Sequence, residues 1–144
     1  MSGEETRASY GYWTDITTRW ADCDPYGHVN NAQYYSYFDT ALTTMLIARG
    51  VLRSDLGRSI GLCVESQCKF HAPISFPATI AAGVRIGHLG SKSIRYEIGL
   101  FEADAQAPSA TGYFVHVFVD PDSRRPVALT DAQRAAVADL VAGG

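Results

Sequence analysis

The chain has 144 residues, of which 47% are apolar and 19% charged, and its net charge is −3. This length fits a single domain, residues 1–144, that is large enough to bury a core without disulfide or metal staples. The weak negative charge argues against nucleic-acid binding, and no apolar stretch approaches the roughly 20 residues of a membrane span.

The first predicted elements are a strand and a long helix. Aromatic and β-branched residues favour a strand from about Tyr10 to Arg19. Helical spacing then runs from Asn31 to about Arg49, and Gly50 stands where a C-terminal cap is expected. A single apolar stripe follows this helix, formed by Tyr34, Phe38, Ala41, Leu42 and Met45. That stripe predicts a helix with one buried face.

Four strand-like runs follow a loop at 51–59, and a short helix closes the chain. The runs span residues 60–70, 78–89, 92–103 and 109–120. Their connections are short, so neighbouring strands are expected to be mostly antiparallel. Thr130 fits the N-cap of a helix over 131–141. The order predicts an α+β fold in which one antiparallel sheet of about five strands curls around the long helix.

The connection WADCDPYGHVNNAQYY, residues 20–35, carries more polar groups than a turn requires. Asn30 fits the helix N-cap, with Gln33 as its capping-box partner. The helix then begins at Asn31, and its free N–H groups can polarise a carbonyl oxygen. Pro25 and Gly27 give a turn that could aim the Asp24 carboxylate toward the helix start. A carboxylate facing such a helix end suits hydrolysis of an acyl group.

Several other interpretations of this connection stay open. An Asp before Pro-x-Gly is commonly a turn residue that bonds its own backbone. Asp22 could simply accept a loop N–H, His28 could be structural, and Asp22 with Asp24 could bind a divalent metal. The three cysteines are odd in number, match no zinc spacing and favour reduced thiols in a cytoplasmic protein. Cys23 lies between two aspartates, which disfavours its thiolate.

The segment RWADCDPYGHVNNAQYYSYF, residues 19–38, closely resembles the signature of the 4-hydroxybenzoyl-CoA thioesterase family of the hotdog superfamily. The resemblance covers about residues 13–120 and includes HLGSKSIRYE, residues 88–97, which looks like the family's strand–turn–strand segment. It implies a hotdog fold and an acyl-CoA thioesterase that needs no metal or redox cofactor. It also implies pairing of sheets across a two-fold axis, so a homodimer or homotetramer is expected.

The resemblance also assigns roles to residues of the loop. Asp24 matches the family's catalytic aspartate, as general base or nucleophile, and the backbone N–H of Asn31 matches the donor that polarises the thioester carbonyl. Gly27 matches the glycine that lets the loop pass close to the thioester. His28 and Asn30 match positions that vary across the family, so their roles stay open.

The acidic protein has one basic segment that could hold the phosphates of CoA. In RIGHLGSKSIRYE, residues 85–97, Ser91 and Ser93 flank Lys92 in a predicted turn, with Arg85 and Arg95 on either side. A solvated hairpin is the structural alternative. A second basic pair, Arg124 and Arg125 in the last predicted loop, is a weaker candidate.

The acyl group cannot be read from the aromatics of the long helix. Tyr34, Tyr35, Tyr37 and Phe38 could line a pocket for an aryl or medium chain, or they could belong to the core. Two other functions stay open: a non-catalytic protein that binds acyl thioesters or acyl carriers, and a hydratase or dehydratase that pairs His71 with Glu65.

Overall fold

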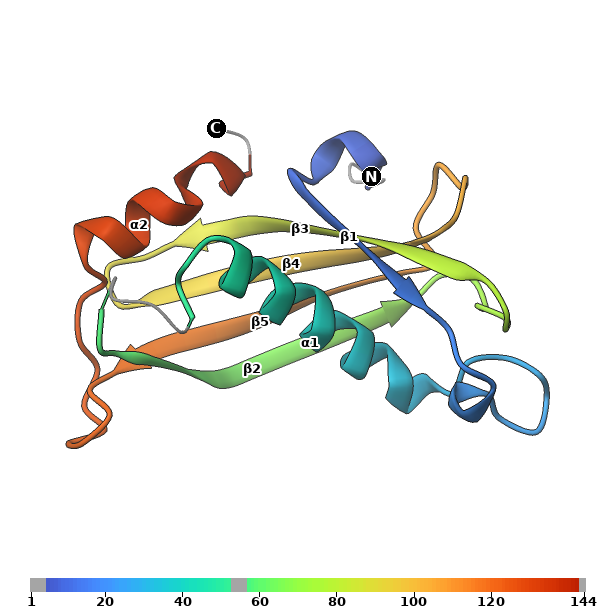
Figure 1. Cartoon of the computed structure of the whole chain (residues 1–144), viewed down its shortest axis with the longest axis horizontal. Helices are drawn as coiled ribbons and strands as arrows, with labels where there is room; N and C mark the ends of the chain where they lie inside the picture. The colour runs from blue at the N-terminus through green and yellow to red at the C-terminus, as the bar shows by residue number, and fades with distance from the viewer. Residues whose placement is uncertain (1–4, 53–56, 143–144) are drawn as a thin grey trace.

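The computed structural model describes residues 5–52 and 57–142. These residues form a five-stranded antiparallel sheet with the strand order β1-β3-β4-β5-β2 (Figure 1). The strands are β1 (Tyr12–Thr17), β2 (Ile60–Phe70), β3 (Thr79–Leu89), β4 (Ser93–Glu102) and β5 (Ala110–Val119). The α-helices are α1 (Asn31–Ala48) and α2 (Asp131–Val137), and short 3₁₀ turns cover Arg7–Ser9, Trp20–Asp22 and Ala138–Leu140.

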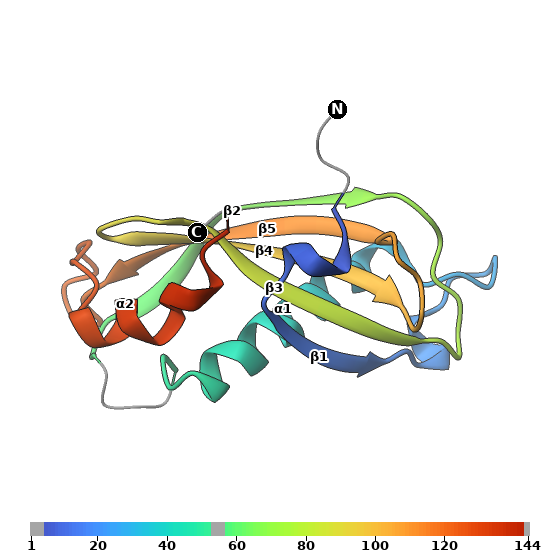
Figure 2. The ribbon, with the colours of Figure 1, turned by 90° about the horizontal axis from the view of Figure 1, so that it is seen from above.

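The sheet curls around α1, which lies along its concave face (Figure 2). All five residues of the predicted apolar stripe are buried, so the prediction of one core-facing side is confirmed. They pack against the inward side chains of the sheet, which in β4 include Ile94, Tyr96, Ile98 and Leu100. Together these residues form the core of a hotdog fold, in which a curved sheet wraps a central helix.

Both helices begin where the sequence predicts; α1 ends at Ala48 with Arg49 as its C-cap, as predicted, whereas α2 ends earlier. Gly50 adopts a φ of 75° beyond the end of α1, and the Val51 N–H donates to the Leu46 carbonyl at 2.9 Å. This is the left-handed C-terminal cap expected of a glycine. Thr130 caps α2 through a reciprocal capping box with Gln133. The chain then passes into the 3₁₀ turn at Ala138–Leu140, so α2 is shorter than predicted.

The connection between β2 and β3 is short but does not form a hairpin. β2 pairs with β5, whereas β3 pairs with β1 and β4. Short connections therefore predicted the antiparallel directions correctly but not this pairing. The reason is that α1 carries the chain across the concave face from β1 to β2, which leaves β2 at the opposite edge of the sheet.

The strand β2 is an exposed edge. Ten of its eleven residues are exposed, among them the apolar Leu62, Val64 and Phe70. An edge strand with unpaired backbone groups and apolar side chains is a ready surface for another strand. No helix within residues 5–52 and 57–142 is both long and apolar enough to cross a lipid bilayer.

Candidate active site

The loop between β1 and α1 is closed by its own backbone hydrogen bonds. The Asp24 N–H donates to the His28 carbonyl at 2.8 Å, and the Gly27 N–H donates back to the Asp24 carbonyl at 3.1 Å. Gly27 has a φ of 84°, and a Cβ placed there would meet no atom within 4 Å. The glycine is therefore required by the backbone conformation of the turn rather than by crowding in this chain.

The two oxygens of the Asp24 carboxylate differ in their hydrogen bonding. Its Oδ1 accepts the N–H of Tyr26 at 2.9 Å and the N–H of His28 at 3.2 Å. These bonds are the turn interaction that an Asp before Pro-x-Gly makes. Within residues 5–52 and 57–142, no group donates a hydrogen bond to Oδ2. The half-buried side chain is thus fixed by one oxygen, while the other remains available.

Asp22 is held differently, although it lies only two residues away. Its side chain is 1% exposed and accepts the Arg19 N–H, the Arg19 guanidinium and the Tyr37 hydroxyl, the last at 2.7 Å. Burial by itself raises the pKa of this carboxyl, but the hydrogen bonds from Arg19 and Tyr37 outweigh burial and leave the pKa below its usual range. Asp22 is therefore a structural anion whose two oxygens are both occupied by hydrogen bonds.

The N-terminus of α1 follows the Asp24 loop directly. Asn30 is the N-cap, as predicted, but its Oδ1 accepts the Ala32 N–H at 2.9 Å rather than that of Gln33. The predicted capping box is wrong because the Asn30 N–H already donates to the Asp22 carbonyl at 2.8 Å. Within the described chain the Asn31 N–H has no acceptor, and the residue is exposed. An open donor at the positive end of the helix dipole is suited to a carbonyl oxygen or an anion.

The connection between β2 and β3, which the sequence did not indicate as part of the site, is hydrogen-bonded to the Asp24 loop. The Val29 N–H donates to the Ile74 carbonyl at 2.7 Å, and His28 forms a β-bridge with Ser75. The His28 side chain itself is exposed. An apolar Ile74 between turn residues was the available signal, because an isolated apolar residue in a connection often anchors that connection to the core.

The aromatics of α1 separate into core and surface positions. Tyr34, 3% exposed, packs edge-on against Phe70 with ring centroids 4.9 Å apart, and Tyr37 and Phe38 are also buried. Tyr35 is 37% exposed and stacks on Phe114. In this chain the Tyr34 ring is therefore a core group.

The two arginines of the basic segment are already neutralised. Arg85 forms ion pairs with Glu5 at 2.5 Å and with Glu97 at 2.7 Å, and Arg95 pairs with Glu97 at 2.9 Å. The Arg95 guanidinium also lies over the Tyr113 ring, 3.8 Å from its centroid. The sequence could not reveal the Arg85 pair, because Arg85 reaches Glu97 only after β3 and β4 pair.

Lys92 is the cation of this segment that faces solvent. It is exposed in the turn between β3 and β4, and no described carboxylate pairs with it. Ser91 is also exposed, and its carbonyl accepts the Leu129 N–H at 2.8 Å, while the Ser93 carbonyl accepts the Gly90 N–H at 2.8 Å. The turn is therefore rigid and presents one ammonium group. Arg124 and Arg125 are exposed in the last loop as well.

The structure does not bring Lys92 and Asp24 together within one chain. Thr17, at the end of β1, pairs with Thr79 at the start of β3, whereas the Lys92 turn follows the far end of that 11-residue strand. At about 3.3 Å per residue, β3 separates the two regions by roughly 30 Å. They lie at opposite ends of the sheet in Figure 1.

His71 and Glu65 are not a catalytic pair in this chain either. The His71 Nε2 bonds to the Thr111 hydroxyl at 2.8 Å, and Glu65 accepts the Tyr113 hydroxyl. Six positions along an extended chain place the two side chains on the order of 20 Å apart. This separation argues against the hydratase or dehydratase interpretation.

Comparisons with known proteins agree with this architecture. The model of the thioesterase-like superfamily matches residues 18–137. The PA5185 protein of Pseudomonas aeruginosa is 46% identical, with a TM-score of 0.89 over 96% of this chain and 97% of that chain. Slr0204, a 1,4-dihydroxy-2-naphthoyl-CoA thioesterase from Synechocystis, is 18% identical, with a TM-score of 0.78 over 90% and 96% of the two chains.

A further solved structure with this fold contains CoA. It is SAV2348 from Staphylococcus aureus, which is 14% identical, with a TM-score of 0.81 over 95% of this chain and 84% of that chain. At such identities the last two structures establish the shared fold. The family assignment rests on the superfamily match, which covers most of the chain and includes the whole Asp24 loop. The chain belongs to the thioesterase-like superfamily.

Proposed function

We propose that this protein hydrolyses acyl-CoA thioesters to a free acid and CoA, with Asp24 as general base or nucleophile. The observation that carries the proposal is the free Oδ2 of Asp24 on a loop fixed immediately before the open N-terminus of α1. Membership of the thioesterase-like superfamily supports it. On the same fold, Slr0204 is a CoA thioesterase and SAV2348 has been solved in complex with CoA.

The chemistry follows from the two groups. The Asn31 N–H donates to the thioester carbonyl oxygen and stabilises the negative charge that develops there. In the general-base route, Asp24 takes a proton from water as the water oxygen attacks the carbonyl carbon. The tetrahedral intermediate then expels the CoA sulfur, which leaves with that proton, and the acid product keeps the water oxygen. In the nucleophilic route, a mixed anhydride with Asp24 forms first and is then hydrolysed.

The separation of Lys92 from Asp24 supports a site shared between two copies of the chain. If Lys92 contacts the CoA phosphates, the Lys92 of one copy has to bind the CoA whose thioester lies at the Asp24 of another copy. Two β2 edges that pair antiparallel across a two-fold axis would reverse one copy end to end relative to the other. They would also cover the exposed Val64 and Phe70. We therefore infer a homodimer or homotetramer in which the partner supplies the phosphate-binding turn.

Asp24→Asn is the direct test. The amide keeps the turn bond at one oxygen but neither accepts the proton nor attacks, so kcat on acyl-CoA should fall by roughly 10²–10⁴ with little change in affinity. Asp15→Asn is the matched control, because Asp15 is an exposed residue of β1. Full activity of Asp24→Asn on a substrate that the wild type cleaves well would show that the site is assigned wrongly.

Single-turnover hydrolysis in ¹⁸O-water separates the two roles of Asp24. A general base places solvent oxygen in the acid product at the first turnover. A nucleophile whose anhydride is hydrolysed at the Asp24 carbonyl delivers an oxygen from its own carboxylate, so the first product is unlabelled and the label appears in Asp24.

The second candidate is a non-catalytic protein that binds acyl thioesters or acyl carriers. It is favoured by the two backbone bonds to Asp24 Oδ1, which a purely structural turn residue would also make. A panel of acyl-CoA substrates decides between the candidates. A binding protein would leave the thioester intact, and Asp24→Asn would then leave its affinity for acyl-CoA unchanged.

A further inference from the structure

Asp22 contacts α1 at two positions. Its backbone carbonyl accepts the N–H of Asn30, the N-cap, at 2.8 Å, and its Oδ2 accepts the Tyr37 hydroxyl at 2.7 Å. Asp22 belongs to the 3₁₀ turn that leads into the Asp24 loop, at the end of the sheet where α1 begins (Figure 1). One residue therefore joins the segment that carries Asp24 to the helix that begins at Asn31.

The bond between Tyr37 and Asp22 is buried on both sides. Tyr37 is 4% exposed and Asp22 is 1% exposed, so water competes little for either group. Burial raises the pKa of the Tyr37 hydroxyl, and the hydrogen bond to Asp22 raises it further, so the hydroxyl is a neutral donor at physiological pH. A hydroxyl that donates to an ionised carboxylate makes a charge-assisted bond, about twice as strong as a bond between neutral groups.

The two contacts with Asp22 lie on the same face of α1. Tyr37 follows Asn30 by almost two helical turns, which is about 10 Å along the helix axis. A long side chain on a helix leans back toward the N-terminus, so the Tyr37 ring can reach the residue that holds Asn30. A helix held at one point can pivot about it, whereas a second point also fixes its rotation. The Tyr37 bond is that second point.

Arg19 holds the other side of the Asp22 carboxylate. Its Nε and Nη2 donate to Oδ1 at 3.0 and 2.8 Å, and its backbone N–H donates to Oδ2 at 3.0 Å. Arg19 directly precedes the 3₁₀ turn, so these bonds fix the carboxylate against its own segment of chain. The Tyr37 hydroxyl is the contact that connects this carboxylate to α1.

We propose that Tyr37 is a positioning residue for thioester hydrolysis, because its bond to Asp22 sets how the Asn31 N–H lies relative to the Asp24 carboxylate. The inference rests on the proposed function, in which these two groups act on one thioester carbonyl. Tyr37 is buried and acts through Asp22. A misplacement of about 1 Å in an active site can lower the rate roughly 100-fold, so a small shift of α1 against the loop is sufficient to slow the reaction.

Tyr37→Phe is the direct test, because it removes the hydroxyl and keeps the buried ring. At saturating acyl-CoA we expect kcat to fall about tenfold with KM nearly unchanged, since the weakened interactions are those made in the transition state. Circular dichroism should show the wild-type secondary structure and a Tm that is lower by a few degrees.

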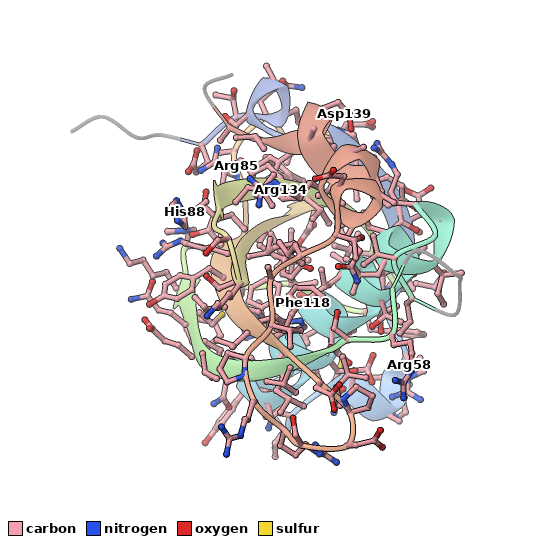
Figure 3. The ribbon with its side chains drawn as sticks, turned by 90° about the vertical axis from the view of Figure 1, so that its left-hand side faces the viewer. Arg58, Arg85, His88, Phe118, Arg134 and Asp139 are labelled. Carbon is pink, nitrogen blue, oxygen red and sulfur yellow. The ribbon has the colours of Figure 1, made fainter. Side chains whose placement is uncertain are left out.

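Two control variants separate positioning from a general loss of stability. Arg49→Met removes the ion pair between Arg49 and Asp139, 2.6 Å long, at the other end of α1. Figure 3 views the molecule from that end and labels Asp139. Tyr10→Phe removes the hydroxyl of another buried tyrosine, which packs against Phe101. Arg49→Met should lower the Tm, and both variants should keep the wild-type kcat.

A double variant tests whether Tyr37 acts on the placement of Asp24. In the Asp24→Asn protein the carboxylate is already lost, so adding Tyr37→Phe should lower kcat little further. Two losses that multiply would mean that the Tyr37 hydroxyl affects the reaction by another route.

Three outcomes overturn the inference alone while Asp24→Asn remains impaired: a wild-type kcat in Tyr37→Phe, an equal loss of kcat in Arg49→Met, or losses that multiply in the double variant. A fully active Asp24→Asn would instead refute the proposed function, and the inference with it. The two failures therefore give different results in the same set of assays.

Discussion

Asp22→Asn is expected to destabilise the fold and to do so in a pH-dependent manner. The wild-type carboxylate is 1% exposed and accepts hydrogen bonds at both oxygens from Arg19 and Tyr37. An amide can keep the Arg19 guanidinium at its oxygen, and the Tyr37 hydroxyl can turn to accept from its NH₂. The Arg19 backbone N–H, however, would face a second donor and lose its partner.

The magnitude follows from this loss. An orphaned donor costs about 1–3 kcal/mol. The lost charge adds less than about 1 kcal/mol, because the Arg19 side chain is 69% exposed and its attraction is screened. The free energy of unfolding should therefore fall by about 1–4 kcal/mol at pH 7. For a chain of this length that corresponds to a Tm lower by about 3–12 °C.

Circular dichroism melts at a series of pH values provide the assay. The pKa of Asp22 is lower in the folded than in the unfolded protein, so its contribution is fully present above the unfolded value of about 3.9 and is lost as the pH falls through the folded value. The Tm difference between wild type and variant should be constant from pH 7 to about pH 5 and should shrink below about pH 4. Asp15→Asn, on the exposed face of β1, should melt like the wild type. A wild-type Tm for Asp22→Asn at pH 7 would refute the reasoning.

Three other predictions concern the loop, the turn and the edge. Lys92→Ala should raise KM for CoA thioesters but not for pantetheine thioesters that lack the nucleotide; equal losses for both would remove Lys92 from phosphate binding. Gly27→Ala should lower the unfolding free energy by about 1–2 kcal/mol, because φ is positive there, and Gly27→Asn should cost less. Val64→Lys, at an exposed position of β2, should convert the oligomer to monomer in light scattering, and a monomeric wild type would contradict the shared site.

Most of the fold could be predicted from local patterns. The stripe from Tyr34 to Met45 identified the buried face of α1, and Gly50 and Thr130 marked helix ends through their own backbone and hydroxyl chemistry. The pairing of β2 with β5 was not predictable in this way, because it depends on where α1 delivers the chain. Local sequence carries no information on that path.

The candidate site divides in the same manner. Asp24 and Asn31 could be proposed from the sequence because a single short segment contains both the carboxylate and the helix start. The structural roles of Asp22 and Arg85 could not be predicted. Their partners, the Tyr37 hydroxyl for Asp22 and the carboxylates of Glu5 and Glu97 for Arg85, come within bonding distance only in the folded chain. The type of a residue predicts which chemistry it can perform. Which group neutralises its charge depends on the tertiary structure.

The bonds from Val29 to Ile74 and from His28 to Ser75 give the β2–β3 connection control over the Asp24 loop. That connection touches neither the carboxylate nor the helix start, yet it holds the strand-like segment between them. Insertions or deletions near Ile74 would therefore tilt Asp24 relative to Asn31 without altering either residue. Natural variation or directed evolution of activity in this protein can thus act through a connection that is remote in sequence from both residues but hydrogen-bonded to the loop that carries Asp24.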